Sequence, residues 1–302
     1  MTKVSVVSTT NRKEGTAEAI RLLQNNPVQV KSVILKPNFN SADPTPGSTH
    51  IDTLRALIVS LQKMGASKIT LAERSGPGDT TRQVIEKKGV FSLAQELGFQ
   101  IVNLQELGPT GWVRVQPKNS HWKNGFLFPR IYAEAESIVE TCCLKTHQYG
   151  GHFTLSLKLA VGMTPGGFEE VRGHSYMGEM HGSAYQRQMI AEINAAFKTD
   201  LIVLDGVESF VAGGPARGTR KQAAVILAGS DRIAIDAVGV AILRMLGTTP
   251  EVSRGRIFEQ DQIARAAEIG LGVTSADQIQ LVADDVKSKE LVRRIEAVLY
   301  RG

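Results

Sequence analysis

The sequence holds only two cysteines, the neighbours Cys142 and Cys143. Two adjacent thiols cannot build a disulfide framework, a CxxC redox pair or a zinc pair. The chain also lacks an uncharged apolar run near the roughly 18 residues that a membrane span needs. It begins Met-Thr-Lys-Val-Ser-Val-Val, which is typical of a strand rather than of a targeting segment. We therefore expect a reducing, cytoplasmic location without membrane contact.

Charge of one sign is not concentrated in any part of the chain. The 35 Lys and Arg residues exceed the 30 Asp and Glu residues by a formal charge of +5, and the basic residues form neither a stripe nor a tail. This distribution does not favour a nucleic-acid partner. A mild basic excess suits an anionic small molecule better, and such a ligand is the partner that we predict.

Short β-branched runs alternate with amphipathic stretches in the first hundred residues. The predicted strands lie at 4–8, 33–35, 69–71 and 101–104, and the predicted helices at 16–23, 49–64 and 80–97. Such alternation is typical of βαβ units. We predict an α/β fold, with a doubly wound, mostly parallel sheet and helices on both of its faces.

The second half of the chain resumes this rhythm after an interruption. Residues 108–135 are rich in Pro, Gly and Trp and predict a hairpin or an irregular excursion. We expect a single α/β domain over 1–302, with this segment as the seam if the domain divides into two lobes. Beyond the seam, the pattern predicts strands at 137–143, 200–205, 223–228 and 278–282, and helices at 153–161, 185–196, 231–246, 256–269 and 287–300.

Polar residues follow several of the predicted strands, where open α/β sheets bind their ligands. Lys36 and Asn38 follow the second strand, beside a helix that Thr49 is expected to cap; the alternative is a simple turn with Lys36 in solvent. Glu73 follows the third strand in a glycine-rich turn that lacks the GxGxxG and GK[ST] nucleotide motifs. Asp205 and Arg217 add an acid and a base near a later strand end. The predicted ligand-binding residues are therefore Lys36, Asn38, Glu73, Asp205 and Arg217.

The densest polar segment runs from 142 to 182. It contains Lys145 and His147 after a strand, and Lys158 on a helix that Thr154 is expected to cap. Because histidine carries protons and binds metals, its clustering favours either role. We predict Lys145, His147, Lys158 and His174 as catalytic residues. The alternatives are a metal site formed by His147, His152 and His174, or histidines that only cap helices.

Two further features of the second half have a structural explanation beside a functional one. Residues 162–182 are glycine-rich and suit a cover over a site, or an exposed loop without a role. Asp231 fits a helix N-cap. Asp236 falls in an otherwise apolar helix and needs a buried partner, which favours a structural pair.

Several short motifs taken together resemble one known family, DUF362, a domain of unknown function. The ordered motifs span roughly residues 30–270. They are Leu-Lys-Pro-Asn at 35–38, Gly-Ala-Ser-Lys-Ile at 65–69, Leu-Lys-Thr-His at 144–147, Leu-Ser-Leu-Lys at 155–158, Leu-Asp-Gly-Val at 204–207, Gly-Gly-Pro-Ala-Arg-Gly at 213–218 and Asp-Arg-Ile-Ala-Ile-Asp-Ala-Val at 231–238.

The resemblance implies a bacterial or archaeal protein from a family in which some members carry ferredoxin-type iron–sulfur segments. Two adjacent cysteines cannot supply the four thiolates of an ordinary cluster. A cluster in this protein would therefore be shared between chains through Cys142 or Cys143. Such sharing implies an oligomer, or a ferredoxin-like partner.

A second similarity concerns only four residues. The order His147, Lys158, Gly162 and His174 is similar to that of His, Lys, Gly and His in the nickel-pincer-dependent lactate racemases. The similarity implies Lys158 as the anchor of the cofactor, His174 as a nickel ligand and His147 as an acid/base.

These observations lead to four hypotheses about function. The first is an enzyme that holds an anionic small molecule or cofactor at the strand ends, with lysines as charge partners and histidines moving protons. The alternatives are a redox protein associated with an iron–sulfur cluster, a nickel-pincer-type, racemase-like isomerase, and a non-catalytic binding protein.

Overall fold

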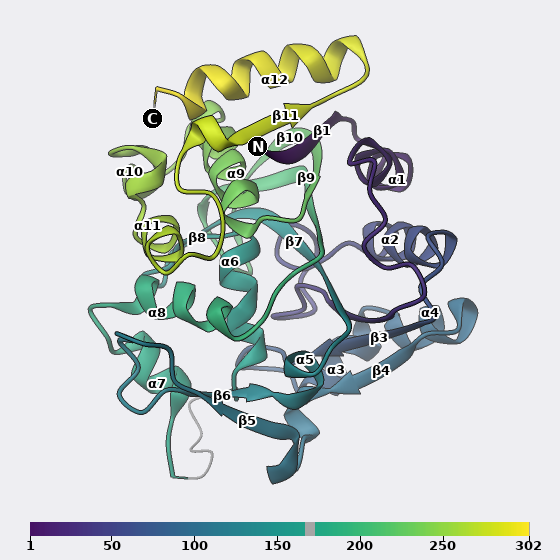
Figure 1. The fold of residues 1–302 in the computed structure, drawn as a ribbon, viewed down its shortest axis with the longest axis vertical. Coiled ribbons are helices and arrows are strands. Elements are labelled where there is room, and N and C mark those ends of the chain that lie inside the picture. Colours follow the sequence, from purple (N-terminus) through teal and green to yellow (C-terminus); the bar gives the residue numbers. More distant parts are fainter. Residues whose placement is uncertain (167–172, 302) are drawn as a thin grey trace.

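The computed structural model describes residues 1–166 and 173–301, and its main feature is one large mixed sheet (Figure 1). Among the described residues, eight strands follow one another across this sheet, and the short β8 pairs with β7 beside that path. From edge to edge the strands are β11 (Ile279–Val282), β1 (Thr2–Ser8), β10 (Gly218–Gly229), β9 (Leu201–Gly213), β7 (Ser137–His147), β2 (Ser32–Lys36), β3 (Lys68–Glu73) and β4 (Gln100–Asn103), with β8 at His152–Thr154.

The strands are mostly parallel. β4, β3, β2, β7 and β9 run in one direction, each paired in parallel with its neighbour. β10 is antiparallel to both β9 and β1, because it returns from β9 through a tight Gly-Gly-Pro turn. The predicted α/β fold with a mostly parallel sheet is therefore confirmed.

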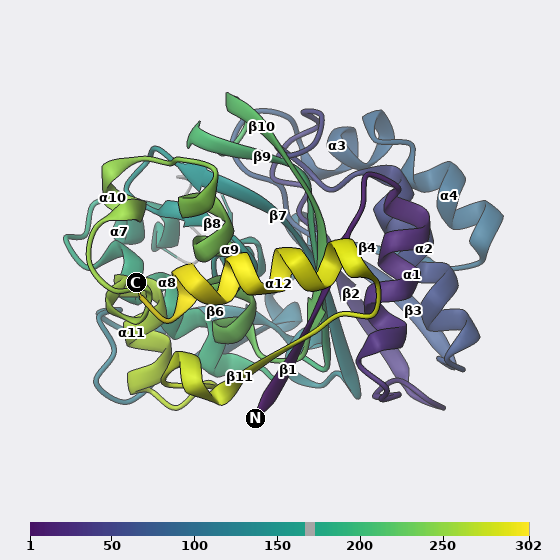
Figure 2. The same cartoon turned by 90° about the horizontal axis from the view of Figure 1, so that it is seen from above.

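Helices cover both faces of the sheet (Figure 2). Consecutive strand residues point to opposite faces: Val33 and Leu35 pack in one hydrophobic cluster, whereas Ile34 between them packs in another. One face carries α1 (Arg12–Leu22), α2 (Ile51–Lys63), α3 (Thr81–Lys87) and α4 (Val90–Leu97). The other carries α5 (Arg130–Ala133), α6 (Ser156–Leu159), α7 (Tyr176–His181), α8 (Gln186–Ile193), α9 (Arg232–Met245), α10 (Pro250–Ser253), α11 (Asp261–Glu268) and α12 (Val286–Leu299).

The predicted excursion at 108–135 is a hairpin. Its strands β5 (Trp112–Val115) and β6 (Phe126–Pro129) form a separate two-stranded antiparallel sheet. Trp112, Trp122 and Phe126 pack from it against α7, α8 and the sheet. The hairpin lies at the end of the molecule opposite to α12 (Figure 1).

Several of the predicted helices differ from those observed, two of them in how the segment is divided. The helix expected at 80–97 is two helices, because Gly89 has a left-handed φ of 71° between α3 and α4. The helix expected at 153–161 begins later, since residues 152–154 pair with β7 as β8. Only α6 is α-helical there, followed by a 3-10 turn at Ala160–Met163.

None of the helices in residues 1–166 and 173–301 is both long enough and apolar enough to cross a membrane. The predicted cover at 162–182 is partly helical, since α7 occupies its last third. Its residues 167–172 lie outside the described residues.

Candidate functional site

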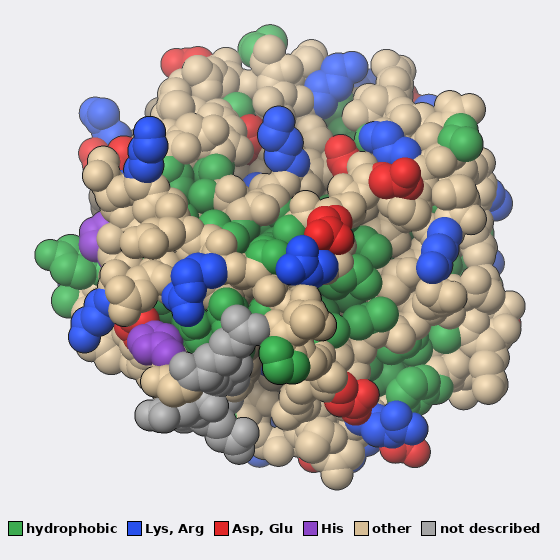
Figure 3. Space-filling view, turned by 60° about the horizontal axis from the view of Figure 1, so that its bottom comes forward, with side chains coloured by type: hydrophobic (Ala, Val, Ile, Leu, Met, Phe, Trp, Pro, Cys, Tyr) green, Lys and Arg blue, Asp and Glu red, His purple; other side chains and the backbone are tan. Residues whose placement is uncertain are grey.

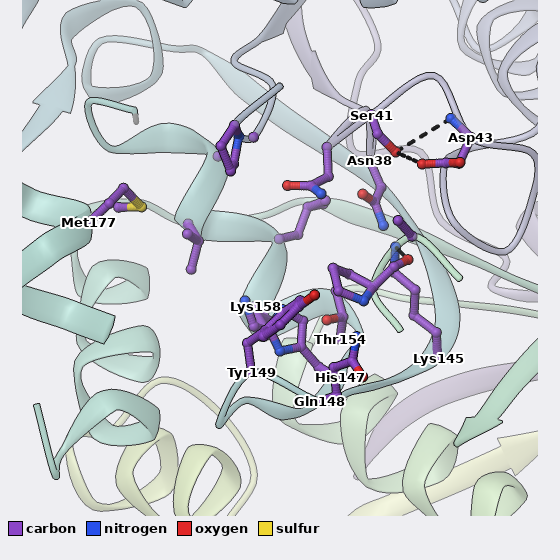
Figure 4. Close-up of a pocket in the computed structure, with 18 of the residues that line it drawn as sticks. Asn38, Ser41, Asp43, Lys145, His147, Gln148, Tyr149, Thr154, Lys158 and Met177 are labelled. Carbon is purple, nitrogen blue, oxygen red and sulfur yellow. Dashed lines mark hydrogen bonds between the residues drawn. The ribbon is translucent and has the colours of Figure 1, made fainter. Parts of the chain in front are cut away.

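A cavity of about 920 Å³ opens at the carboxyl ends of β2, β3 and β7, where open α/β sheets place their ligands. It is closed by the loop after β2, the segment from β7 to α6 and the turn between β9 and β10. Figure 4 shows side chains from these segments converging on it. Seven of the residues predicted to be catalytic or to bind the ligand line this cavity: Lys36, Asn38, Glu73, Lys145, His147, Lys158 and Arg217.

Lys36 and Glu73 form a buried ion pair at the ends of neighbouring strands. Lys36 Nζ lies 2.5 Å from Glu73 Oε1 and also donates to the Pro37 carbonyl at 2.8 Å. Burial lowers the pKa of Lys36, and the Glu73 carboxylate opposes that effect. The alternative of Lys36 in solvent is wrong, because only 2% of the residue is exposed. Thr49 accepts from the Asn38 amide, and His50 caps α2 in its place.

Arg74 follows Glu73 directly and is a cavity residue that the sequence analysis missed. Its guanidinium is buried and donates to the carbonyls of Thr164, Ser75 and Val161. Burial lowers the pKa of Arg74 to about 10. The signal in the sequence was its position next to an acid at a strand end, but nothing there showed that its partners would be backbone atoms.

Lys145 and His147 lie two residues apart near the end of β7, so their side chains leave the strand on the same side. Lys145 Nζ donates to the carbonyl oxygens of Gly47 and Pro215, at 2.6 and 3.1 Å. Burial lowers the pKa of Lys145 to about 8. The pair of hydrogen bonds fixes this amine against two loops at the wall of the cavity.

Lys158 stands on α6 and reaches the cavity from its other side (Figure 4). The residue is 8% exposed, and within the described residues its amine has no hydrogen bond or ion pair. Burial, followed by the charges of Lys145 and Arg74, lowers its pKa to about 7. Near neutral pH the amine is thus close to half protonated.

Three further polar atoms on the cavity wall have no hydrogen-bond partner among the described residues. They are Asn38 Nδ2, His147 Nδ1 and Thr154 Oγ1. Burial and the charges of Lys158, Lys145 and His181 hold the pKa of His147 far below its usual range, so its imidazole is neutral. Because a buried polar atom without a partner is costly, this set indicates groups that a ligand would satisfy.

Thr154 does not cap α6, contrary to the prediction. It belongs to β8, where it stands directly opposite Lys145. The amides of Ser156 and Leu157 instead donate to the buried carboxylate of Asp236 on α9. Asp236 was expected to form a structural pair, and its partner is this helix N-terminus. Asp231 caps α9 as predicted.

Two other histidines of the cluster, His152 and His174, do not line this cavity, whereas His181 on α7 does. His174 lines a second hollow of about 480 Å³, where its Nε2 lies 2.6 Å from Glu179 Oε2. His152 pairs with His147 across β7 and β8 but stays outside the cavity. In residues 1–166 and 173–301 no group of three or more His, Cys, Asp or Glu side chains is placed to hold a metal ion. The set His147, His152 and His174 therefore does not form one site here.

Asp205, Cys142 and Cys143 lie away from the cavity. Asp205 is buried and pairs with Arg12 at 2.8 Å while accepting from Thr53, which ties α1 and α2 to β9. The two cysteines are buried on opposite sides of β7. Burial raises the pKa of Cys143 to about 11 and holds that of Cys142 well above its usual range.

The molecular face drawn in Figure 3 agrees with the scattered charge of the sequence. Figure 3 shows Lys and Arg side chains interspersed with Asp and Glu on this face. The clustering of cations in the cavity at the strand ends therefore contrasts with the mixed charges on this face.

The fold and the site define an α/β protein with a cation-rich cavity at the carboxyl ends of its parallel strands. The chain belongs to the family described as domain of unknown function DUF362, whose sequence profile matches residues 33–241. This span contains every residue singled out above on the cavity wall. Among curated proteins, none matches the chain.

Two solved structures are similar to the chain at low sequence identity. One is the lactate racemase apoprotein from Thermoanaerobacterium thermosaccharolyticum, with 15% identity and a TM-score of 0.46 over 70% of this chain and 51% of that one. The other is a protein from Thermotoga maritima, with 12% identity and a TM-score of 0.46 over 85% of this chain and 58% of that one. The chain thus spans little more than half the length of either protein.

Proposed function

We propose that the protein is an enzyme that binds an anionic small molecule in the cavity at the strand ends, with Lys145 and Lys158 as charge partners. His147, as a neutral imidazole with one donor and one acceptor nitrogen, relays protons to and from the bound molecule. The observation that carries this proposal is the buried amine of Lys158, which faces the cavity without a hydrogen bond or ion pair to any described residue.

The balance of charge around the cavity favours an anion. The Lys36 charge is offset by Glu73, and Arg74 is held by three carbonyl oxygens. Lys145 and Lys158 have no ion pair with a carboxylate in the described part of the chain. Because burial of an uncompensated charge is costly, an anion that binds between them would regain part of that cost.

The orphaned polar atoms favour a ligand with oxygen acceptors. Asn38 Nδ2 is a donor, and Thr154 Oγ1 and neutral His147 Nδ1 can each donate or accept. A carboxylate or phosphate presents several acceptor oxygens in a small volume. The wall therefore offers donors in addition to its two lysines.

The experiment is a calorimetric titration with acetate, oxalate and inorganic phosphate at pH 8. Binding of an anion raises the pKa of Lys158 from about 7, so we expect proton uptake, seen as a binding enthalpy that changes with the ionisation enthalpy of the buffer. Lys158→Met should abolish the uptake and weaken binding at least about tenfold. Exposed Lys63→Met is the matched control and should change neither. Equal binding by Lys158→Met and the parent chain would refute the proposal.

A further inference from the structure

The amine of Lys158 differs from the other two lysine amines of the cavity in its contacts. Lys36 Nζ is engaged by Glu73 and Pro37, and Lys145 Nζ by Gly47 and Pro215. Lys158 Nζ donates to none of the described residues. A hydrogen-bonded ammonium is held as a charge, whereas an amine without acceptors is free to lose its proton and present its lone pair.

The surroundings of Lys158 place a proton carrier next to this amine. A Cβ atom at Gly151 would lie 2.6 Å from Lys158 Cε and 3.0 Å from His147 Nδ1, so both side chains lie against the same backbone position. Any other residue at 151 would displace them. Thr154, opposite Lys145 in the ladder, adds an unpartnered hydroxyl on the same wall. Figure 4 shows His147 and Thr154 between the two lysines in this view.

The charges that face Lys158 favour its neutral form. They are Lys145 on β7 and Arg74 after β3, while His147 and His181, themselves neutral near pH 7, face it from β7 and α7. Burial acts in the same direction, and the pKa of the amine falls to about 7. A desolvated lysine beside a second cation is the environment that makes an amine nucleophilic at neutral pH.

We infer that Lys158 forms an imine with the carbonyl carbon of a small oxo acid whose carboxylate is held by Lys145 and Asn38. This inference rests on the proposed anion site and names the class of ligand that the site binds. The unpartnered amine of Lys158 would react with a carbonyl group. The Lys145 cation and the Asn38 amide would bind an anionic group next to that carbonyl. Both requirements are met by an acid with the carbonyl next to the carboxylate.

The step balances without an oxidant or reductant. The neutral amine adds to the carbonyl carbon and gives a carbinolamine. The former carbonyl oxygen then leaves as water together with the two amine hydrogens, and the C=N bond forms. His147 and Thr154 are placed to pass the proton from nitrogen to the departing oxygen, and water reverses the reaction.

The test is reductive trapping at pH 7. The full chain is incubated with glyoxylate, pyruvate or 2-oxoglutarate and sodium cyanoborohydride, and the adducts are mapped by peptide mass spectrometry. We expect one adduct per chain, on Lys158, formed at least about tenfold faster than any adduct on exposed Lys63, because few lysines of ordinary pKa are neutral at pH 7. Oxalate, which binds as an anion and cannot form the imine, should slow the labelling.

Two variants keep the outcome clear. Lys158→Arg retains a cation, and Lys158→Met retains the approximate shape of the side chain. Thermal unfolding verifies that each variant is folded. Neither variant should form an adduct at position 158. If oxo acids bind in calorimetry while Lys158 is not labelled in preference to Lys63, the imine is refuted and the anion site stands. If none of the three acids, oxalate or phosphate binds and no adduct forms, both proposals are refuted.

Discussion

At the scale of single residues, the cavity shows how partners decide the state of a buried lysine. All three lysines of the cavity are buried, but their partners differ. Lys36 pairs with a carboxylate, Lys145 donates to two carbonyl groups, and Lys158 has no partner among the described residues. Burial lowers the pKa of each, to about 8 for Lys145 and about 7 for Lys158. Lys158 is therefore the residue whose charge should affect stability most clearly near neutral pH.

We predict that the parent chain gains stability relative to Lys158→Met as the pH rises from 7 to 9. The folded pKa of Lys158, about 7, lies below the value of about 10.4 in the unfolded chain. Between the two values the unfolded state binds more protons, so stability rises with pH, by at most about 1.4 kcal/mol per pH unit. Urea unfolding of both proteins across this range, in buffers with chloride as the anion, measures the difference.

Lys63→Met is the control for this comparison, since Lys63 is exposed. Its stability difference from the parent chain should not vary with pH. A constant difference between Lys158→Met and the parent chain would show that the amine keeps an ordinary pKa.

The sequence predicted the positions of the cavity lysines better than their environments. Lys36, Lys145 and Glu73 follow or end strands, and the rule that ligands bind at strand ends was sufficient to select them. The burial of Lys36 and the role of Arg74 depend on loops from three separate parts of the chain. The histidine cluster was misleading, because His152 on β8 and His174, which precedes α7, lie outside the cavity although they are close in sequence to His147.

At the scale of elements, α6 is a short helix that depends on another helix for its cap. Its residues Ser156–Leu159 are buried, and its first amides donate to Asp236 of α9. The local sequence predicted Thr154 as the N-cap of α6. Thr154 is instead a residue of β8, paired with β7, so it cannot cap the helix. A contact over 80 positions cannot be seen in a local pattern.

We predict that Asp236→Ala destabilises the protein by about 3 kcal/mol, because it leaves two buried amides without an acceptor. Asp236→Asn keeps one carbonyl oxygen and should cost about 1 kcal/mol. Since α6 carries Lys158, oxalate affinity should fall in the same order. Urea unfolding and calorimetry measure the two effects, and equal losses for both variants would contradict the capping role.

At the scale of the whole molecule, the sheet order brings the site together. β2, β3 and β7 are neighbours in the sheet, so Lys36, Glu73 and Lys145 meet although they span more than a hundred positions. Hydrophobic alternation predicted the strands and the fold class. It could not predict that β10 is antiparallel, because a strand has the same two-residue period in either direction.

The family match covers residues 33–241, yet elements outside it complete the sheet and the core. β1 and β11 pair with each other at one edge, and α12 packs Ile295 and Leu299 into the cluster around α9. The hairpin with both tryptophans lies at the other end of the molecule (Figure 1). The sequence predicts a single domain. In a single domain, a cavity made at α12 should lower the stability of the hairpin as well, because both ends unfold together.

We therefore predict that Ile295→Ala lowers stability by about 2–5 kcal/mol and shifts one common transition, because it removes a fully buried side chain from the core. Val286→Ala, at an 84% exposed position of the same helix, should stay within about 0.5 kcal/mol of the parent chain. Urea unfolding is followed by circular dichroism and by fluorescence of Trp112 and Trp122. A loss seen by circular dichroism but not by tryptophan fluorescence would show that the two ends unfold separately.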